Sequence, residues 1–393
     1  MDRVPPKSPL KRGLFVQRPL SNWILFFLDF ILGLRKKEIP VFKKPQKILL
    51  CNIANFGDLI ASTAVLPAIK KKYPECEIGF LASSLSGKTV FQNFPSFSKV
   101  HFFDHWYLNR SLGICKAVLQ HWISRRNAIK EIKKAKYDLA IDLHPYFPNA
   151  IPLLANSQIP IRIGYGTGGF SSLLTHPAKW DFADRYVGYS HLHLLEILGI
   201  DAVHESPLPS YRTENLDCTR SQKRCAVEAL GVHVVVHMGS SSTLKEWEIE
   251  KWIELIERLE TVGWKVVLTG KGQRELKLCE KVAAQTNSLN LCNQLSWVDF
   301  VRTIQEAQLV ITVDSVAVHL AAGSLTPTLV LFSGINSPHM WLPPSPFCKG
   351  LMKSVACAPC FNKKGCSSMA CIKGIEVEDI YRTAMEMVCR KQM

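Results

Sequence analysis

Short apolar runs alternate with amphipathic stretches from residue 47 to about residue 164, and this pattern predicts strands alternating with helices. Each apolar run is short and nearly uninterrupted, as expected of a strand in a buried sheet. The predicted strands are 47–53, 77–82, 137–143 and 159–164. Helices are expected over 58–72, which Tyr73-Pro74 ends, and over the basic stretch 128–136. Such alternation is typical of parallel α/β layers.

The same alternation returns after a polar segment, 201–219, which contains Pro207 and Pro209 and reads as a linker. The later predicted strands are 232–237, 264–269, 309–313 and 327–332, and the later helices are 248–259, 273–285, 316–322 and 377–388. A chain of 393 residues is long enough for two domains with separate cores. We therefore expect an α/β protein of two doubly wound, Rossmann-like domains facing each other across a cleft.

These elements divide the chain into five parts. They are a basic and apolar N-terminal segment (1–45), a first domain (46–205), a linker (206–222), a second domain (223–345), and a cysteine-rich segment with a C-terminal helix (346–393). Ligands of open parallel sheets bind beyond the carboxyl ends of the strands. Candidate chemistry is therefore expected in the strand-to-helix turns.

The N-terminal segment contains an apolar run, 23–34, that Asp29 interrupts. A spanning helix needs about 20 apolar residues, so this run is too short, and no signal-peptide cleavage site follows it. Basic residues flank it on both sides: Arg12, Arg18, Arg35, Lys36 and Lys37. Such a helix suits the headgroup region of an anionic membrane. The alternative, equally open from the sequence, is packing on the protein's own body or on another subunit.

Positive charge is concentrated in two places on an otherwise balanced chain of net charge +15. Residues 1–50 carry a net +8 and residues 110–136 a net +7, and the second stretch has Glu131 as its only acidic residue. Local basic patches favour anionic surfaces or ligands. Nucleic acid is the less favoured partner because the stretch 110–136 has few aromatic residues and no nucleic-acid-binding motif.

Thirteen cysteines, irregularly spaced and without a readable secretory signal, indicate free thiols in a reducing compartment. Four of them form a close group near the C-terminus: Cys357, Cys360, Cys366 and Cys371. Four thiols can hold a structural Zn²⁺. Because the spacing is tighter than in common zinc ribbons, a reduced cluster that packs the C-terminal segment is the favoured interpretation.

The first strand-to-helix turn places Gly57-Asp58 at a predicted helix start. A carboxylate there can accept a proton from an incoming hydroxyl. Asp is also common at the beginning of helices, where it satisfies backbone N–H groups. Spacing alone favours this capping role for Asp58.

Two later turns suit an anionic ligand. The loop 237–247 is rich in Gly and Ser, offers backbone N–H groups to a diphosphate, and contains Lys245, which can neutralise a departing phosphate. The alternative is a solvated polar loop. At the end of strand 309–313, Asp314 and Ser315 precede His319, which lies one helical turn beyond Ser315. By itself, His319 would be a partly buried structural histidine.

Taken in this order and spacing, the turns resemble glycosyltransferase family 9, the ADP-heptose:lipopolysaccharide heptosyltransferases, over about residues 47–390. The matching motifs are Gly57-Asp58 with Leu66-Pro67-Ala68, Tyr137-Asp138 with Ile141-Asp142-Leu143, Ile163-Gly164-Tyr165, the loop from His237 and Gly239 to Lys245 and Trp247, and the block of Asp314, Ser315, His319, Leu320, Ala321 and Ala322. The cysteine-rich segment is also similar to that of many members.

The resemblance implies an inverting, metal-independent glycosyltransferase of the GT-B type, which moves a heptose or related sugar from a nucleotide diphosphate sugar, suspected to be ADP-heptose, to a lipopolysaccharide core acceptor. No cofactor is then required. The first domain would bind this anionic, lipid-linked saccharide, and the second would bind the donor. The enzyme would be cytoplasmic and peripheral on the inner face of the membrane, with no nucleic-acid partner. The alternatives are a glycosyltransferase with another donor or surface-glycan acceptor, and a non-catalytic nucleotide-sugar-binding homologue.

By this likeness Asp58 is the general base, in place of the capping role, and Lys245 contacts the diphosphate. The implied donor site comprises Gly239, Ser240, Ser241, Thr243, Gln273, Asp314, Ser315 and His319, and the expected acceptor site comprises Asn55, Lys133, Lys134 and Lys136. Two positions depart from the family pattern. Val316 stands where a glycine is usual, and Gln273 where an acidic residue for the nucleotide ribose is common.

Overall fold

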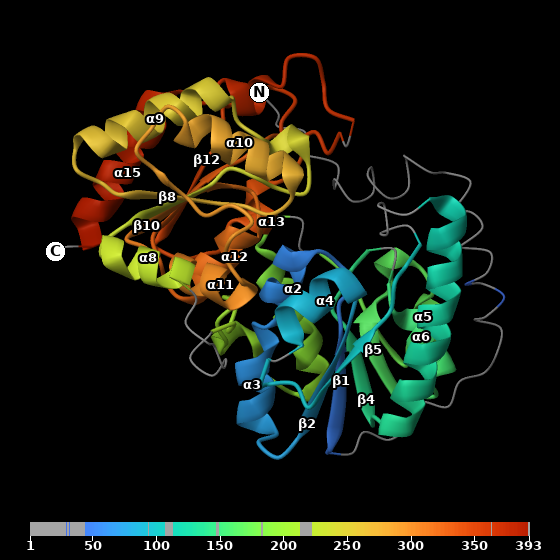
Figure 1. The fold of residues 1–393 in the computed structure, drawn as a ribbon. Helices are drawn as coiled ribbons and strands as arrows, with labels where there is room; N and C mark the ends of the chain where they lie inside the picture. The colour runs from blue at the N-terminus through green and yellow to red at the C-terminus, as the bar shows by residue number, and fades with distance from the viewer. Residues whose placement is uncertain are drawn as a thin grey trace. The chain divides into compact units, whose positions relative to one another are not determined.

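A computed structural model describes Asp29, Ile31 and residues 44–391, apart from 93, 107–112, 147–148, 182–183, 213–221 and 363. The chain divides into two compact units, Met1–Pro207 and Leu208–Met393, and each is considered by itself (Figure 1). Both contain a six-stranded sheet whose neighbouring strands are all parallel. The predicted α/β fold of two doubly wound sheets is confirmed.

The sheet of the first unit has the order β3-β2-β1-β4-β5-β6. Its strands are β1 (Lys47–Cys51), β2 (Glu77–Ala82), β3 (Lys99–Phe102), β4 (Leu139–Asp142), β5 (Ile161–Tyr165) and β6 (His176–Ala178). One face carries α2 (Phe56–Ser62), α3 (Val65–Lys72), α4 (Ser84–Phe91) and α7 (Val187–His193), and the other carries α5 (Ile114–Ala135) and α6 (Ile151–Asn156) (Figure 1). Apolar residues of β1, β4, α5 and α6 bury one another on this second face.

The sheet of the second unit has the order β12-β11-β10-β7-β8-β9. Its strands are β7 (Val234–His237), β8 (Val266–Thr269), β9 (Leu289–Asn290), β10 (Leu309–Val313), β11 (Thr328–Leu331) and β12 (Cys348–Leu351). Its helices are α8 (Gln222–Leu230), α9 (Ile249–Thr261), α10 (Gln273–Ala283), α11 (Trp297–Gln305), α12 (Val316–Gly323), α13 (Pro338–Trp341), α14 (Ala370–Lys373) and α15 (Val377–Lys391). The largest core of this unit lies between the sheet and α9, α10 and α15.

Every strand expected from the apolar runs is present, and the expected helix 58–72 is present as two helices. Pro67 explains the break between α2 and α3 because it lacks the N–H that would donate to the carbonyl oxygen of Thr63 and its ring would clash there. The N–H of Leu66 donates to that oxygen instead, at 3.1 Å. The helix expected at 128–136 begins much earlier, at Ile114.

Asp29 and Ile31 are the described residues of the apolar run 23–34. The two carboxylate oxygens of Asp29 accept hydrogen bonds from the backbone N–H groups of Ser171 (3.0 Å) and Ser172 (2.8 Å). These amides begin the short 3₁₀ helix η3 (Ser171–Leu173), so Asp29 attaches to its own unit. Most of the run 23–34 and its basic flanks lie outside the described residues. Within the part of the chain that is described, no helix combines the length and apolar character needed to cross a membrane.

Candidate active site

A buried ion pair lies at the carboxyl edge of the second sheet. Asp314 directly follows β10, and its Oδ2 lies 2.7 Å from the Nζ of Lys245, at the end of the 3₁₀ helix η6 (Thr243–Lys245). The two side chains are only 7% and 14% exposed. The Nδ2 of Asn336 donates to the same Oδ2 at 2.8 Å. Two residues that the sequence placed in separate turns are therefore in contact, and Asn336, which no motif indicated, completes the cluster.

The helix that follows Asp314 begins with the two other polar residues of its motif. The Oγ of Ser315 accepts from the N–H of Ala317 at 3.3 Å and so caps α12. His319, one turn further, is 2% exposed. Burial lowers the pKa of His319 to about 4, while the charge of Asp314 raises it and that of Lys245 lowers it. His319 is therefore a neutral imidazole near the ion pair at neutral pH. Val316 is half-buried in the first turn.

The loop after β7 is held in place by its own hydroxyl groups and by α10. The Oγ of Ser240 donates to the carbonyl oxygen of Ser242 at 2.9 Å, and Arg274 donates to the carbonyl oxygen of Ser240. A Cβ on Gly239 would lie 2.1 Å from the Cδ of Glu275, so any other residue there would displace the Glu275 side chain. Ser241 and Thr243 are exposed.

Glu275 is an acidic residue beside this loop that sequence reasoning missed. Gln273, the predicted ribose contact, is the first residue of α10 and is exposed. Glu275, two residues later, has a side chain only 14% exposed, and its Oε2 accepts from the N–H of Lys271 at 2.8 Å. The sequence does show an acid two residues after Gln273, but spacing alone did not tell which of the two side chains, Gln273 or Glu275, faces Gly239.

In the first unit, Asp58 occupies the first turn of α2. Its Oδ2 accepts from the backbone N–H of Asn55 at 3.2 Å, as in a capping box. The capping interaction that spacing favoured is thus present. Burial raises the pKa of Tyr146, and the negative charge of Asp58 adds to that rise. Tyr146 therefore lies within electrostatic reach of the Asp58 carboxylate, and no motif pointed to it.

The buried carboxyl group of Asp142 holds the loop that carries Tyr146 through hydrogen bonds. The Oδ1 of Asp142 accepts from the N–H of His144 at 3.2 Å, and its Oδ2 accepts from that of Ala150 at 2.8 Å. Burial raises the pKa of Asp142 to about 7, against the lowering effect of these hydrogen bonds. Asp142 therefore fixes the path of the chain from β4 to α6.

The lysines expected to bind the acceptor lie far from Asp58 along the sheet. Lys133 and Lys134 are in the last turn of α5, and Lys136 follows at its C-cap with φ 55°. This end of α5 leads into the amino end of β4, whereas Asp58 follows the carboxyl end of β1. A helix of 22 residues is roughly 33 Å long, so the two regions are separated by about the height of the unit. The structure does not bring these lysines together with Asp58.

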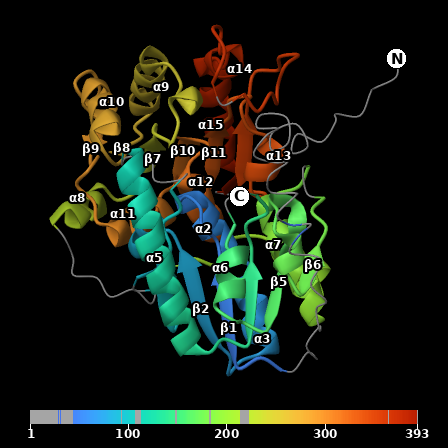
Figure 2. The ribbon, with the colours of Figure 1, turned by 90° about the vertical axis from the view of Figure 1, so that its right-hand side faces the viewer.

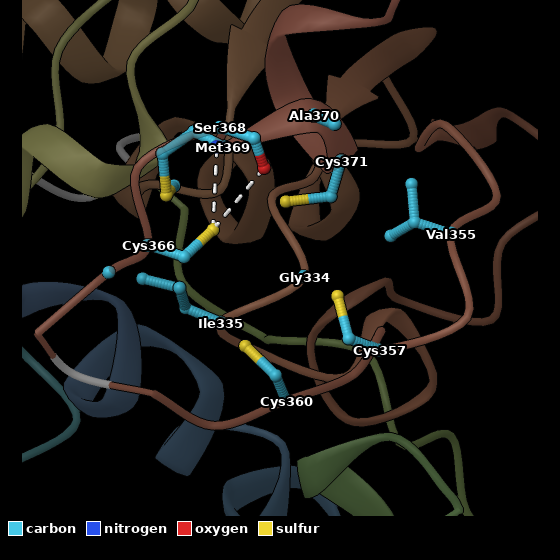
Figure 3. A pocket seen from close by; sticks show the side chains of 11 residues that line it. Gly334, Ile335, Val355, Cys357, Cys360, Cys366, Ser368, Met369, Ala370 and Cys371 are labelled. Carbon is cyan, nitrogen blue, oxygen red and sulfur yellow. Dashed lines mark hydrogen bonds between the residues drawn. The ribbon is translucent and has the colours of Figure 1, made fainter.

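The cysteine group lines one cavity of about 110 Å³ in the second unit (Figure 3). The four thiols of Cys357, Cys360, Cys366 and Cys371 face it, together with apolar side chains. The N–H of Met369 donates to the Sγ of Cys366 at 3.4 Å, which lowers the pKa of that thiol. As the described residues are placed, no three potential ligands lie close enough together to hold a metal ion. A zinc site, the less favoured alternative, would require the thiols to turn towards one another, and the reduced cluster stays the prediction.

Comparison with known proteins agrees with the motifs. The family model described as "Glycosyltransferase family 9 (heptosyltransferase)" matches residues 125–370. Lipopolysaccharide heptosyltransferase 3 of Escherichia coli K12 is 27% identical over 301 residues, which cover 73% of this chain and 82% of that protein.

Solved structures agree in fold. A glycosyltransferase family 9 protein from Veillonella parvula superposes with a TM-score of 0.71 at 18% identity, covering 90% of this chain and all of that one. The E. coli heptosyltransferase WaaC with ADP gives a TM-score of 0.65 at 15% identity, covering 87% of this chain and 99% of that one. These likenesses confirm the α/β architecture as that of GT-B heptosyltransferases. Since the family model covers more than half of the chain, the protein belongs to glycosyltransferase family 9 and is a glycosyltransferase.

Proposed function

We propose that this enzyme transfers a heptose from ADP-heptose to a saccharide of the lipopolysaccharide core, with inversion at the anomeric carbon. The curated relative named above is a lipopolysaccharide heptosyltransferase, and the WaaC structure contains ADP. The observation that carries the proposal is the buried cluster of Lys245, Asp314 and Asn336 at the carboxyl edge of the second sheet. Open α/β sheets bind nucleotides at this edge.

The donor is held by groups of the second unit. Lys245 contacts the diphosphate, and the N–H groups of the loop 239–243 supply neutral donors beside it. Asp314 holds the lysine side chain in position through its Oδ2, and Asn336 holds the carboxylate by donating a hydrogen bond to the same oxygen. His319, being neutral, adds a hydrogen bond to sugar or phosphate without adding charge. We assign the ribose hydroxyls to Glu275 in preference to Gln273, because Glu275 lies against Gly239.

The acceptor hydroxyl is activated by Asp58 of the first unit. The carboxylate removes the hydroxyl proton while the oxygen attacks the anomeric carbon from the face opposite the diphosphate. The new C–O bond forms as the bond from that carbon to the phosphate oxygen breaks, through an oxocarbenium-like transition state. The electron pair leaves on the diphosphate, where Lys245 and the loop N–H groups stabilise the growing charge. The products are the glycoside, ADP and a proton that Asp58 returns to solvent.

The donor assignment is tested by measuring the melting temperature with ADP, UDP, GDP and CMP. ADP alone is expected to stabilise the protein strongly, by linkage between binding and folding. Lys245→Met should abolish this stabilisation. Lys277→Met, which alters an exposed lysine on α10, should preserve it. A larger effect of UDP, GDP or CMP would identify a transferase with another donor, and no effect of any nucleotide would refute the assigned site.

The acceptor places the reaction at a membrane. A lipopolysaccharide core saccharide is anchored by its lipid, so we propose that the enzyme works peripherally on the cytoplasmic face of the inner membrane, where its nucleotide sugar is available. Lys133, Lys134 and Lys136 lie at the edge of the sheet opposite Asp58, so we propose them as contacts to lipid phosphates and not to the reacting saccharide.

A further inference from the structure

Along the outer face of α5, the N-terminal half is mainly apolar and the C-terminal half is mainly cationic. Residues three and four positions apart lie close together on one face of a helix. In α5 the face turned away from the sheet carries Leu119, Trp122 and Ile123, followed by Arg126, Lys130 and Lys134, and all six side chains are exposed. The opposite face is buried through Ala117, Ser124, Ala128 and Ile132. Figures 1 and 2 both show α5 on the outside of the first unit.

The apolar half is too exposed to be explained by packing within the described residues. Its exposed fractions are 81% for Ile114, 61% for Leu119, 55% for Trp122, 46% for Ile123 and 38% for Val118. Isolated exposed apolar residues are ordinary, but a contiguous group on one helix marks an interaction surface. The guanidinium carbon of Arg125 lies 5.8 Å from the Trp122 ring centroid, so a cation adjoins the aromatic ring.

We propose that this face of α5 docks the enzyme onto an anionic lipid bilayer. Apolar side chains, with Trp122 among them, enter the boundary between headgroups and acyl chains, and the cations contact lipid phosphates. Each Lys or Arg near such a surface strengthens binding by roughly fivefold. The inference rests on the proposed function in one respect: a lipid-anchored acceptor explains why the first unit would need a membrane surface.

The charge pattern argues against a second copy of the chain as the occupant. Two copies related by a twofold axis through the middle of α5 would run antiparallel, so the apolar half of one would meet the cationic half of the other. That arrangement would bury Arg126 and Lys130 against apolar side chains without acidic partners, and an axis through the apolar half alone would leave the cationic half uncovered. A bilayer, in contrast, satisfies both halves at once.

The test is flotation of the full-length protein with vesicles of phosphatidylcholine, with and without phosphatidylglycerol. Wild-type protein should float with the anionic vesicles. The triple variant Leu119→Gln, Trp122→Gln and Ile123→Gln should weaken this binding at least about tenfold. The triple variant Arg126→Glu, Lys130→Glu and Lys134→Glu should remove the preference for anionic lipid.

Matched controls alter exposed apolar residues and exposed lysines elsewhere in the chain. Val203→Gln with Val262→Gln, and Lys277→Glu with Lys281→Glu on α10, should bind vesicles as wild type does. All variants should keep the ADP-induced rise in melting temperature, so a membrane defect is distinguished from failure of the donor assignment. Wild-type protein that does not float, variants that float unchanged, or a dimer that only the apolar variant loses would overturn the proposal.

Discussion

Asp58 combines two roles that single substitutions can separate. In Asp58→Asn, the amide oxygen can still accept the hydrogen bond from the N–H of Asn55, but the side chain cannot take up a proton. We expect turnover to fall by about 10²–10⁴-fold while the ADP-induced rise in melting temperature is unchanged. The measurement is the rate of ADP release with donor and acceptor present.

Asp58→Ala is the structural control for this experiment. It removes both the base and the acceptor of the capping bond, so unfolding by urea should show an additional loss of about 0.5–2 kcal/mol. If Asp58→Asn retained wild-type turnover, Asp58 would be a capping residue alone, and the protein would need another base.

The sequence identified those site residues that belong to local motifs. Asp314, Ser315 and His319 are neighbours along one turn, and the chemistry of their motif is readable without the fold. Asn336 and Glu275 lie beside the residues of these motifs, and Tyr146 lies near Asp58, only through packing, because the segments that carry them have no distinctive spacing. The positive charge of Lys133, Lys134 and Lys136 was equally visible, but the edge of the sheet at which they lie follows from the length of α5.

Among the elements, the connection from β4 to α6 contains Asp142, which should make the free energy of unfolding depend on pH. The pKa of Asp142 is raised to about 7, so between about pH 4 and pH 7 the folded state holds a proton that the unfolded state has released. The contribution of Asp142 to stability is therefore largest below pH 4 and is lost as the pH rises towards 7. Cys51, which adjoins Asp142, stays a neutral thiol because burial raises its own pKa.

Asp142→Asn should remove this dependence. We expect the free energy of unfolding of the variant, relative to wild type, to increase from pH 5 to pH 8, measured by urea denaturation at each pH. His144, whose pKa burial lowers to about 4, is present in both proteins and cancels in the comparison. A difference between the two proteins that stayed constant with pH would show that Asp142 does not titrate in this range.

Element boundaries were predictable where the apolar pattern is regular. The buried strands are short apolar runs, so their positions were evident. The helix α5 was recognised only from residue 128 because Leu119, Trp122 and Ile123 occupy its exposed side and obscure the expected alternation. The break between α2 and α3 follows from Pro67, which has no N–H for the carbonyl oxygen of Thr63. The deviations from regular patterning thus mark both a backbone constraint and the surface proposed for membrane docking.

For the whole molecule, the two units have separate cores and should respond differently to the nucleotide. Apolar clusters lie within residues 49–159 of the first unit and within residues 234–388 of the second. The proposed donor contacts all come from the second unit. Calorimetry should therefore resolve two unfolding transitions, of which ADP moves only one.

The size of that shift can be anticipated from linkage. At a concentration 100 times its Kd, ADP should stabilise the second unit by about 2.7 kcal/mol, which raises the melting temperature of a unit this size by about 5–10 °C. Lys245→Met leaves the buried Asp314 without its cation, so the second transition should begin lower, but ADP should shift neither transition of this variant. In Asp58→Asn the shift caused by ADP should be the same as in wild type. If calorimetry showed a single transition that ADP raised as a whole, the two units would unfold as one cooperative body, and the prediction of independent units would be wrong.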